Sequence, residues 1–148
     1  MKSGKHISTL IIVLLLALML PSLISLLRGP AATPDLFSAG YSLEQANALS
    51  DESGKPVYVL ATADWCAPCQ ALKRGALHDP QVVDLIENRA IPVYLESGTN
   101  PEEIRSLGVR AFPTTMILEH GQVISMMEGG ASAERYADAL RSSLPESP

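Results

Sequence analysis

The apolar residues of this chain are unevenly distributed, and the densest run lies at the start. Residues 7–27 carry no charged side chain, two lysines precede this stretch, and Arg28 follows it. A positive start followed by an apolar run is typical of a secretory signal peptide or of a signal anchor. We therefore expect residues 1–28 to be one of these and the rest of the chain to be exported.

The length of the run favours an anchor. A cleaved signal has an apolar region of roughly 7–15 residues, whereas a membrane span needs roughly 17–25. The uncharged stretch covers 21 positions, although Pro21 and Ser22 weaken its second half. Residues 29–31 are small but match the Ala-x-Ala cleavage pattern poorly. We expect an inner-membrane anchor with the following domain on the periplasmic side, and signal cleavage to a soluble periplasmic protein is the alternative.

Beyond residue 40 the apolar positions alternate between helical and strand spacing. Residues 29–40, rich in proline and alanine, are expected to be a linker, and residues 41–148 a single folded domain. The pattern predicts helices at residues 42–54, 67–77, 79–89, 101–107 and 133–144, and strands at residues 56–63, 91–95, 114–118 and 122–127. Helices covering both faces of a central sheet are the natural packing for this order.

Local signals support several of these boundaries. Ser42 and Gln45 form a capping box at the start of the first helix, and Gly54 ends it. Asp79 and Pro80 open the third helix in the same way, as a cap followed by a proline at the first helical position. Further signals are Asn100-Pro101, the hairpin dipeptide His120-Gly121, and Ser132 before the last helix.

The charge of the predicted domain limits its partners. Residues 1–30 contain three basic and no acidic side chains, so the remainder has eight basic against sixteen acidic groups. Nucleic acid and anionic lipid surfaces reward clustered lysine and arginine. We therefore expect no nucleic-acid partner.

The chemistry-bearing motif is Trp65-Cys66-Ala67-Pro68-Cys69, which contains both cysteines of the chain. Two thiols this close can close into a disulfide and open again as a two-electron switch. A structural bridge is a weak alternative because so short a loop adds little stability. No further cysteine or histidine stands at metal-ligand spacing, so no metal or cofactor is expected.

The motif, together with Phe112-Pro113-Thr114 before the hairpin, resembles the thioredoxin family over residues 41–144. Residues 63–66 and 79–82 are most similar to the exported C-terminal domain of DsbD-type reductant transporters. The resemblance implies an α/β thioredoxin fold, a central mixed sheet with helices on both faces. It also implies thiol–disulfide oxidoreductase activity on cysteine-containing exported proteins, with a membrane thiol reductant transporter as a possible electron donor.

Two site roles follow from helix physics. Cys66 stands at a predicted helix N-terminus, where free N–H groups and the helix dipole favour a thiolate, so it is expected to attack. Cys69 is then the resolving thiol. The resemblance adds Pro113 as a cis-proline facing the disulfide and Phe112 as a backbone partner of substrate. Trp65, Ala67 and Pro68 complete the expected substrate-binding residues.

One position departs from the family pattern. Thioredoxins place an acidic residue six positions before the first cysteine, where it helps to move the proton of the resolving thiol. This chain has Leu60 there, and Asp64 and Glu96 are the candidates to replace the acid.

Three residues favour a low reduction potential, at which the protein would act as a reductant. Pro68 removes a backbone N–H, Ala67 adds no charge, and Asp64 disfavours a second negative charge nearby. We therefore expect a reductase that acts as a monomer, since no dimerisation segment is visible. A disulfide donor or isomerase, and a non-catalytic thioredoxin-fold assembly module, remain the alternatives.

Overall fold

The computed structural model describes residues 11–20 and 29–145, and the chain divides into two units, Met1–Pro30 and Ala31–Pro148. In the first unit, residues 11–20 form a helix whose side chains are all exposed. Within the two described ranges, no helix is long and apolar enough to cross a membrane. Residues 1–10 and 21–28, which complete the predicted signal or anchor, lie outside the described residues.

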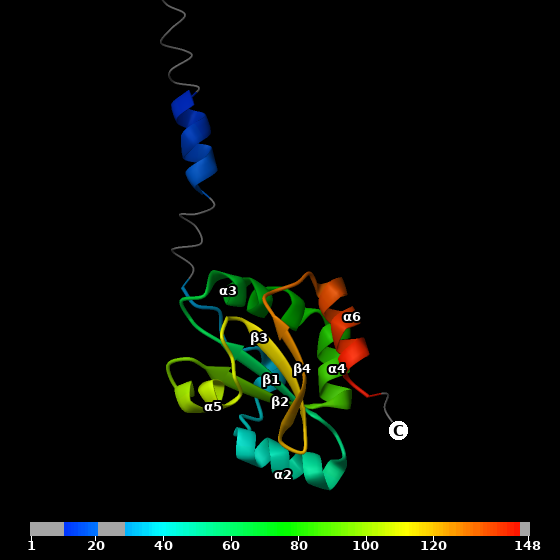
Figure 1. The fold of residues 1–148 in the computed structure, drawn as a ribbon. Helices are drawn as coiled ribbons and strands as arrows, with labels where there is room; N and C mark the ends of the chain where they lie inside the picture. Colours follow the sequence, from blue (N-terminus) through cyan, green and yellow to red (C-terminus); the bar gives the residue numbers. More distant parts are fainter. Residues whose placement is uncertain (1–10, 21–28, 146–148) are drawn as a thin grey trace, which may run out of the picture. The chain divides into compact units, whose positions relative to one another are not determined.

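The second unit alternates helices and strands in the predicted order (Figure 1). Its elements are η1 (Asp35–Phe37), α2 (Leu43–Ser53), β1 (Val57–Thr62), α3 (Ala67–Arg74), η2 (Ala76–His78), α4 (Pro80–Arg89), β2 (Ile91–Glu96), α5 (Pro101–Ser106), β3 (Thr114–Glu119), β4 (Gln122–Glu128) and α6 (Ala133–Ser143).

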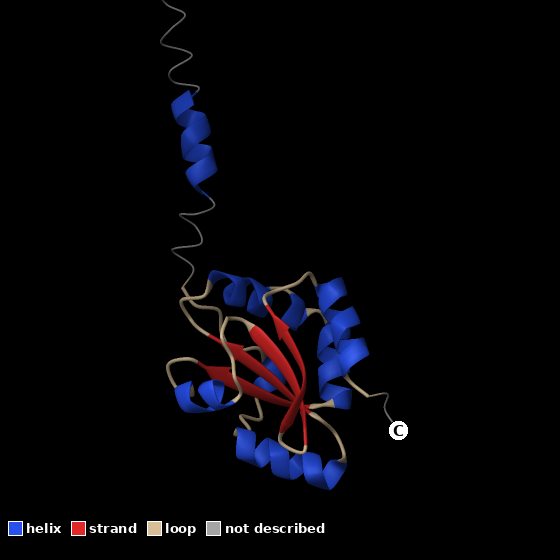
Figure 2. Ribbon diagram, in the orientation of Figure 1, coloured by secondary structure: helices blue, strands red, loops and turns tan. Residues whose placement is uncertain are grey.

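The four strands form one mixed sheet in the order β2-β1-β3-β4 (Figure 2). Strand β1 runs parallel to β2 and antiparallel to β3, and β3 and β4 form the predicted hairpin. Strand β4 is therefore an edge strand, and its Val123, Ile124 and Met126 side chains are exposed.

Alternation along the central strands divides the core into two layers, because successive side chains of a strand point to opposite faces. Tyr58 and Leu60 face the layer that contains α3, α4, α6 and η1. Val57, Val59 and Ala61 face the layer that contains α2 and α5. The predicted sheet with helices on both faces is confirmed.

Most of the predicted local signals occur as expected. Ser42 and Gln45 form a reciprocal capping box, and Gly54 ends α2 in the left-handed conformation with φ 73°. The hairpin turn places His120 and Gly121 at φ 50° and 73°, as a two-residue turn requires. Ser132 stands at the predicted N-cap of α6 but makes no side-chain cap hydrogen bond.

The helix that follows the cysteine motif is shorter than predicted. Helix α3 ends at Arg74, and the chain continues after Gly75 as the separate turn η2. Gly75 adopts φ −111° and ψ −98°, which is outside the helical region. A continuous helix to residue 77 was therefore one turn too long.

The segment expected to be a linker, residues 29–40, is partly core. Leu36 and Phe37 of η1 are buried, and Phe37 stacks on Tyr58 and meets the edge of Tyr94. The composition of the segment concealed this role because only two of its residues are large and apolar. The compact unit accordingly begins at Ala31 rather than at residue 41.

Three buried hydroxyl groups join β1, β3 and α6. The hydroxyl of Tyr136 lies 2.6 Å from the Tyr58 hydroxyl and 2.6 Å from Thr115 Oγ1. Burial raises the pKa of Tyr58 well above its usual value, and the neighbouring Tyr136 adds to this rise. Burial also raises the pKa of Tyr136. Both phenols therefore stay protonated in the folded protein far into the alkaline range.

Candidate active site

The two cysteines lie at the N-terminus of α3 and form a disulfide, with an S–S distance of 2.09 Å. Cys66 is the N-cap of the helix, and the backbone N–H of Cys69 donates to Cys66 Sγ at 3.2 Å. Cys66 is 5% exposed, whereas Cys69 is completely buried. Of the two cysteines, only Cys66 therefore keeps surface that an external group can contact.

The turn between β1 and α3 presents this disulfide. The chain leaves the sheet after Thr62, buries Ala63, and exposes Asp64 and Trp65 before the helix begins. The Cys66 N–H donates to the Ala63 carbonyl at 3.2 Å, which closes the turn. The strand thus delivers the cysteines to a helix end whose free N–H groups favour negative charge.

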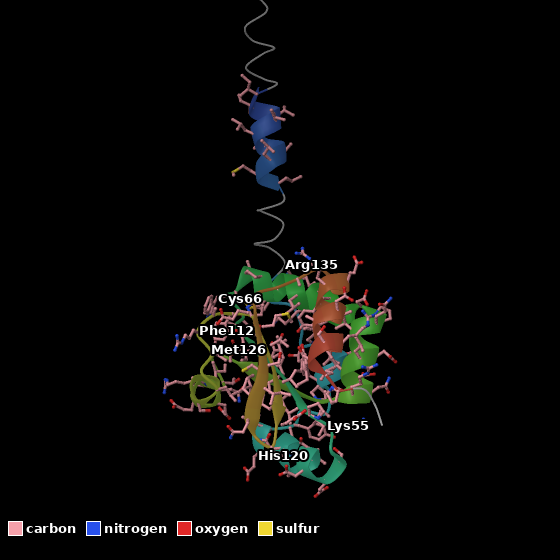
Figure 3. All side chains as sticks on the ribbon, turned by 45° about the vertical axis from the view of Figure 1, so that its right-hand side comes forward. Lys55, Cys66, Phe112, His120, Met126 and Arg135 are labelled. Atoms are coloured by element: carbon pink, nitrogen blue, oxygen red, sulfur yellow. A yellow bond between two sulfur atoms is a disulfide. The ribbon has the colours of Figure 1, made fainter. Side chains whose placement is uncertain are left out.

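The loop before β3 contacts the cysteine cluster through Phe112. The peptide bond between Phe112 and Pro113 is cis, and the Pro113 carbonyl accepts from the Gly129 N–H at 2.7 Å. Phe112 packs against the small cluster made by Ala63 and the two cysteines. Figure 3 shows Cys66 and Phe112 close together at one end of the domain, with Lys55 and His120 at the other end.

The structure exposes three of the sequence-predicted substrate-binding residues, Trp65, Ala67 and Pro68, on either side of Cys66 in the chain. Trp65 is 77% exposed, and its ring meets Phe112 edge-on with centroids 5.9 Å apart. Ala67 and Pro68 are exposed on the first turn of α3, and Pro113 is buried. Trp65 therefore contributes its indole to the protein surface rather than to the core.

The two candidates to replace the acid missing at Leu60, Asp64 and Glu96, both have other partners in the structure. Leu60 is buried in the α4 and α6 layer, opposite Tyr94 of β2. Glu96 instead accepts hydrogen bonds from the backbone of Asp64 and Gly98 at 3.3 and 2.6 Å. Asp64 Oδ1 lies 3.3 Å from Lys73 Nζ, so its negative charge is paired. The expected effect of Asp64 on the cysteines is therefore offset by an ammonium group.

Two residues of the site were not predicted. The Gln70 side chain donates to the carbonyls of Ala63 and Asp64 and accepts from the Ala31 N–H, which fixes the turn before the cysteines. Lys73 is buried one helical turn beyond Cys69. The available signal was their spacing, because both fall on the helical face that carries Cys66 and Cys69.

The fold and the site together define a class of protein, a thioredoxin-like thiol–disulfide oxidoreductase. The sequence model of the family described as thioredoxin-like domain matches residues 43–143. The chain belongs to this family.

Individual relatives agree with this assignment. The chain is 36% identical to a thioredoxin of Chlorobaculum thiosulfatiphilum over 89 residues, which cover 60% of this chain and 80% of the relative. It is 25% identical to the thiol:disulfide interchange protein DsbD of Citrobacter koseri over 104 residues, 66% of this chain and 18% of the relative. The solution structure of a thioredoxin from Thermus thermophilus superposes with a TM-score of 0.62 at 26% identity, covering 69% of this chain and 83% of that one. The predicted thioredoxin fold and DsbD-like similarity are confirmed.

Proposed function

We propose that this protein is an exported, membrane-tethered reductase that transfers two electrons from its dithiol to disulfides of other exported proteins. The observation that carries the proposal is the Cys66–Cys69 disulfide at the start of α3, of which only Cys66 has exposed surface. The similarity to DsbD and the basic-then-apolar residues 1–28 support the exported setting.

The reaction has two balanced steps. The Cys66 thiolate attacks one sulfur of a substrate disulfide, a mixed disulfide forms, and the other substrate sulfur leaves as a thiolate. The Cys69 thiolate then attacks Cys66 Sγ, which releases the second substrate sulfur and forms the Cys66–Cys69 bond. The substrate gains two electrons and two protons. A dithiol donor, for which we propose a membrane reductant transporter, returns the site to its reduced state.

The residues around the cysteines are proposed to bind substrate. Trp65 and Phe112 offer an apolar surface beside Cys66, and Ala67 and Pro68 leave the first turn of α3 open to an approaching chain. Pro113, which is buried next to Phe112 in the chain, is proposed to face the disulfide. These contacts suit an extended peptide segment that carries a cystine.

The direction of electron flow is proposed to be reductive. Pro68 has no N–H to offer a thiolate, and Ala67 adds no charge, so the disulfide is favoured over the dithiol. Asp64 contributes less than the sequence suggested because Lys73 pairs with it.

The first experiment traps the intermediate. In the full-length chain in detergent, Cys69→Ser is expected to accumulate a mixed disulfide with a cystine-containing peptide, detected by mass spectrometry. Cys66→Ser is the matched control and is expected to form none. Full disulfide-exchange activity of Cys66→Ser would contradict the mechanism.

The second experiment measures the direction. The equilibrium reduction potential, titrated against dithiothreitol and followed by Trp65 fluorescence, is expected near or below about −250 mV. A value above about −150 mV would instead assign the protein to the disulfide donors.

The proposed tether has its own test. Fractionation of the producing cells is expected to recover the full-length chain in the inner membrane after carbonate washing. Recovery of a shortened chain in the periplasmic fluid would show that residues 1–28 are a cleaved signal.

A further inference from the structure

Lys73 is a buried ammonium group on the helical face that carries both cysteines. Cys66, Cys69 and Lys73 recur at intervals of three and four residues, which places them on one side of α3. The Lys73 side chain is only 1% exposed. Lysine is almost never fully buried unless it is paired, so this position requires an explanation.

The contacts of Lys73 direct its charge toward the cysteine end of the helix. Its Nζ lies 3.3 Å from Asp64 Oδ1 and 3.2 Å from the Tyr94 hydroxyl. Helical side chains lean toward the helix N-terminus, and Asp64 stands two residues before Cys66. The Lys73 ammonium therefore lies beside the turn that precedes the two cysteines.

The proposed reaction requires the Cys69 thiol to ionise in a buried position. Cys69 is completely buried, and burial disfavours the thiolate that must attack the mixed disulfide. The position that holds an acid in thioredoxins is Leu60 here, so no carboxylate from β1 assists the step. A nearby positive charge favours the ionised thiol in addition to the N–H groups at the start of α3.

We propose that Lys73 is a positioning residue that favours the Cys69 thiolate and so speeds release of substrate from the mixed disulfide. This inference rests on the proposed function. Cys69 gives its proton to water, its sulfur forms the bond to Cys66, and the departing substrate thiolate takes a proton from water. Asp64 and Tyr94 hold the ammonium in place.

The charges of the groups around Lys73 decide whether its removal raises or lowers the pKa of Cys69. Asp64 and Glu96 are acidic, and Tyr94 is an uncharged phenol on β2. Cys69 also belongs to the small cluster with Ala63 and Cys66 against which Phe112 packs, and neither Ala63 nor Phe112 carries a charge. Arg74 follows Lys73 on the exposed side of α3. Removing the Lys73 charge takes away the cation that is paired with the Asp64 carboxylate, which disfavours the Cys69 thiolate.

The test titrates Cys69 alone. Because the chain has two cysteines, Cys66→Ala leaves one thiol, whose ionisation is followed by thiolate absorbance at 240 nm or by carbon-13 NMR of Cβ. In this background Lys73→Met is expected to raise the pKa of Cys69 by about one unit or more, and Asp64→Asn to lower it. Lys73→Arg is expected to stay near the parent value. Lys55→Met, at the far end of the domain, is the matched control and is expected to change nothing.

A second readout follows the reaction. With both cysteines present, the rate of product release from a preformed mixed disulfide is expected to shift its pH profile upward in Lys73→Met by the same amount. An unchanged Cys69 pKa in both Lys73→Met and Asp64→Asn would overturn the inference. Asp64 is 56% exposed, so its variant tests the inference even if Lys73→Met fails to fold. Failure of the proposed function is distinct, since it would appear as an inactive wild-type protein whatever the Cys69 pKa.

Discussion

Thr62, the last residue of β1, is the clearest single position at which stability can be gained. It is fully buried, and among the described residues its Oγ1 has no hydrogen-bond partner. A buried hydroxyl without a partner costs desolvation energy that an apolar group of similar shape does not. Thr62→Val is therefore expected to leave the free energy of unfolding unchanged or to raise it by up to about 1 kcal/mol.

Urea unfolding with Thr114→Val as the control tests this expectation. Thr114 is also a buried threonine of the sheet, but its Oγ1 donates to the Ala111 carbonyl at 2.8 Å. Its valine variant should lose about 1 kcal/mol. A larger loss in Thr62→Val than in Thr114→Val would show that the Thr62 hydroxyl is stabilising.

For single residues, the sequence sufficed where the role of a residue depends only on its neighbours along the chain. Cys66 and Cys69 are recognisable because their spacing alone permits a disulfide at a helix start. The pairing of Asp64 with Lys73 was not predictable, because it requires the turn before α3 to lie back against the helix. The sequence sign of it was that Lys73 falls at helical spacing from Cys66 and Cys69.

Tyr136 of α6 connects that helix to two strands through hydroxyl groups. Tyr136→Phe removes both 2.6 Å hydrogen bonds and leaves the hydroxyls of Tyr58 and Thr115 buried without this partner. The expected loss in the free energy of unfolding is about 1–3 kcal/mol. Thermal or urea unfolding measures it, and Tyr41→Phe, at an exposed tyrosine, should be neutral. Equal stability of the two variants would mean that the hydroxyl cluster does not stabilise the fold.

Helix and strand positions were predicted well where a cap or turn residue marked them. Ser42, Gly54 and Asp79 act locally, so their effect can be read without the rest of the fold. No capping side chain marks the short turn η1 in the sequence. Its burial depends on Tyr58 and Tyr94, which are distant in sequence.

Phe37 of η1 therefore tests where the domain begins. Phe37→Ala removes a ring that packs on Tyr58 and Tyr94, and the expected loss is about 3–5 kcal/mol. The measurement is urea unfolding, with Asp35→Ala in the same turn as the exposed control. A loss below about 1 kcal/mol would return residues 29–40 to the role of a linker.

For the whole molecule, the buried tyrosines set the alkaline limit of stability. In the unfolded chain both phenols titrate near pH ~10, whereas the folded protein holds its protons to higher pH because the pKa values of Tyr58 and Tyr136 are raised. Above pH ~10 the folded state therefore binds more protons than the unfolded state. Their contribution to stability is full below pH ~10 and declines above it, by up to about 2.7 kcal/mol per pH unit for two groups.

Unfolding free energies measured from pH 8 to 11.5 test this slope. Tyr58→Phe removes one of the two groups and is expected to flatten the alkaline decline, whatever its effect at neutral pH. A decline as steep as that of the wild-type protein would show that Tyr58 ionises equally in both states.

The exposed edge strand β4 has a consequence for how the protein behaves in concentrated solution. Its seven residues include no lysine, arginine or proline, and Glu128 is their one charged side chain, whereas natural sheets use charged residues and proline to discourage edge-to-edge association. At neutral pH the net charge of −5 opposes association of copies. Near the isoelectric point of about 5.1 this repulsion vanishes, so the protein is expected to be least soluble there.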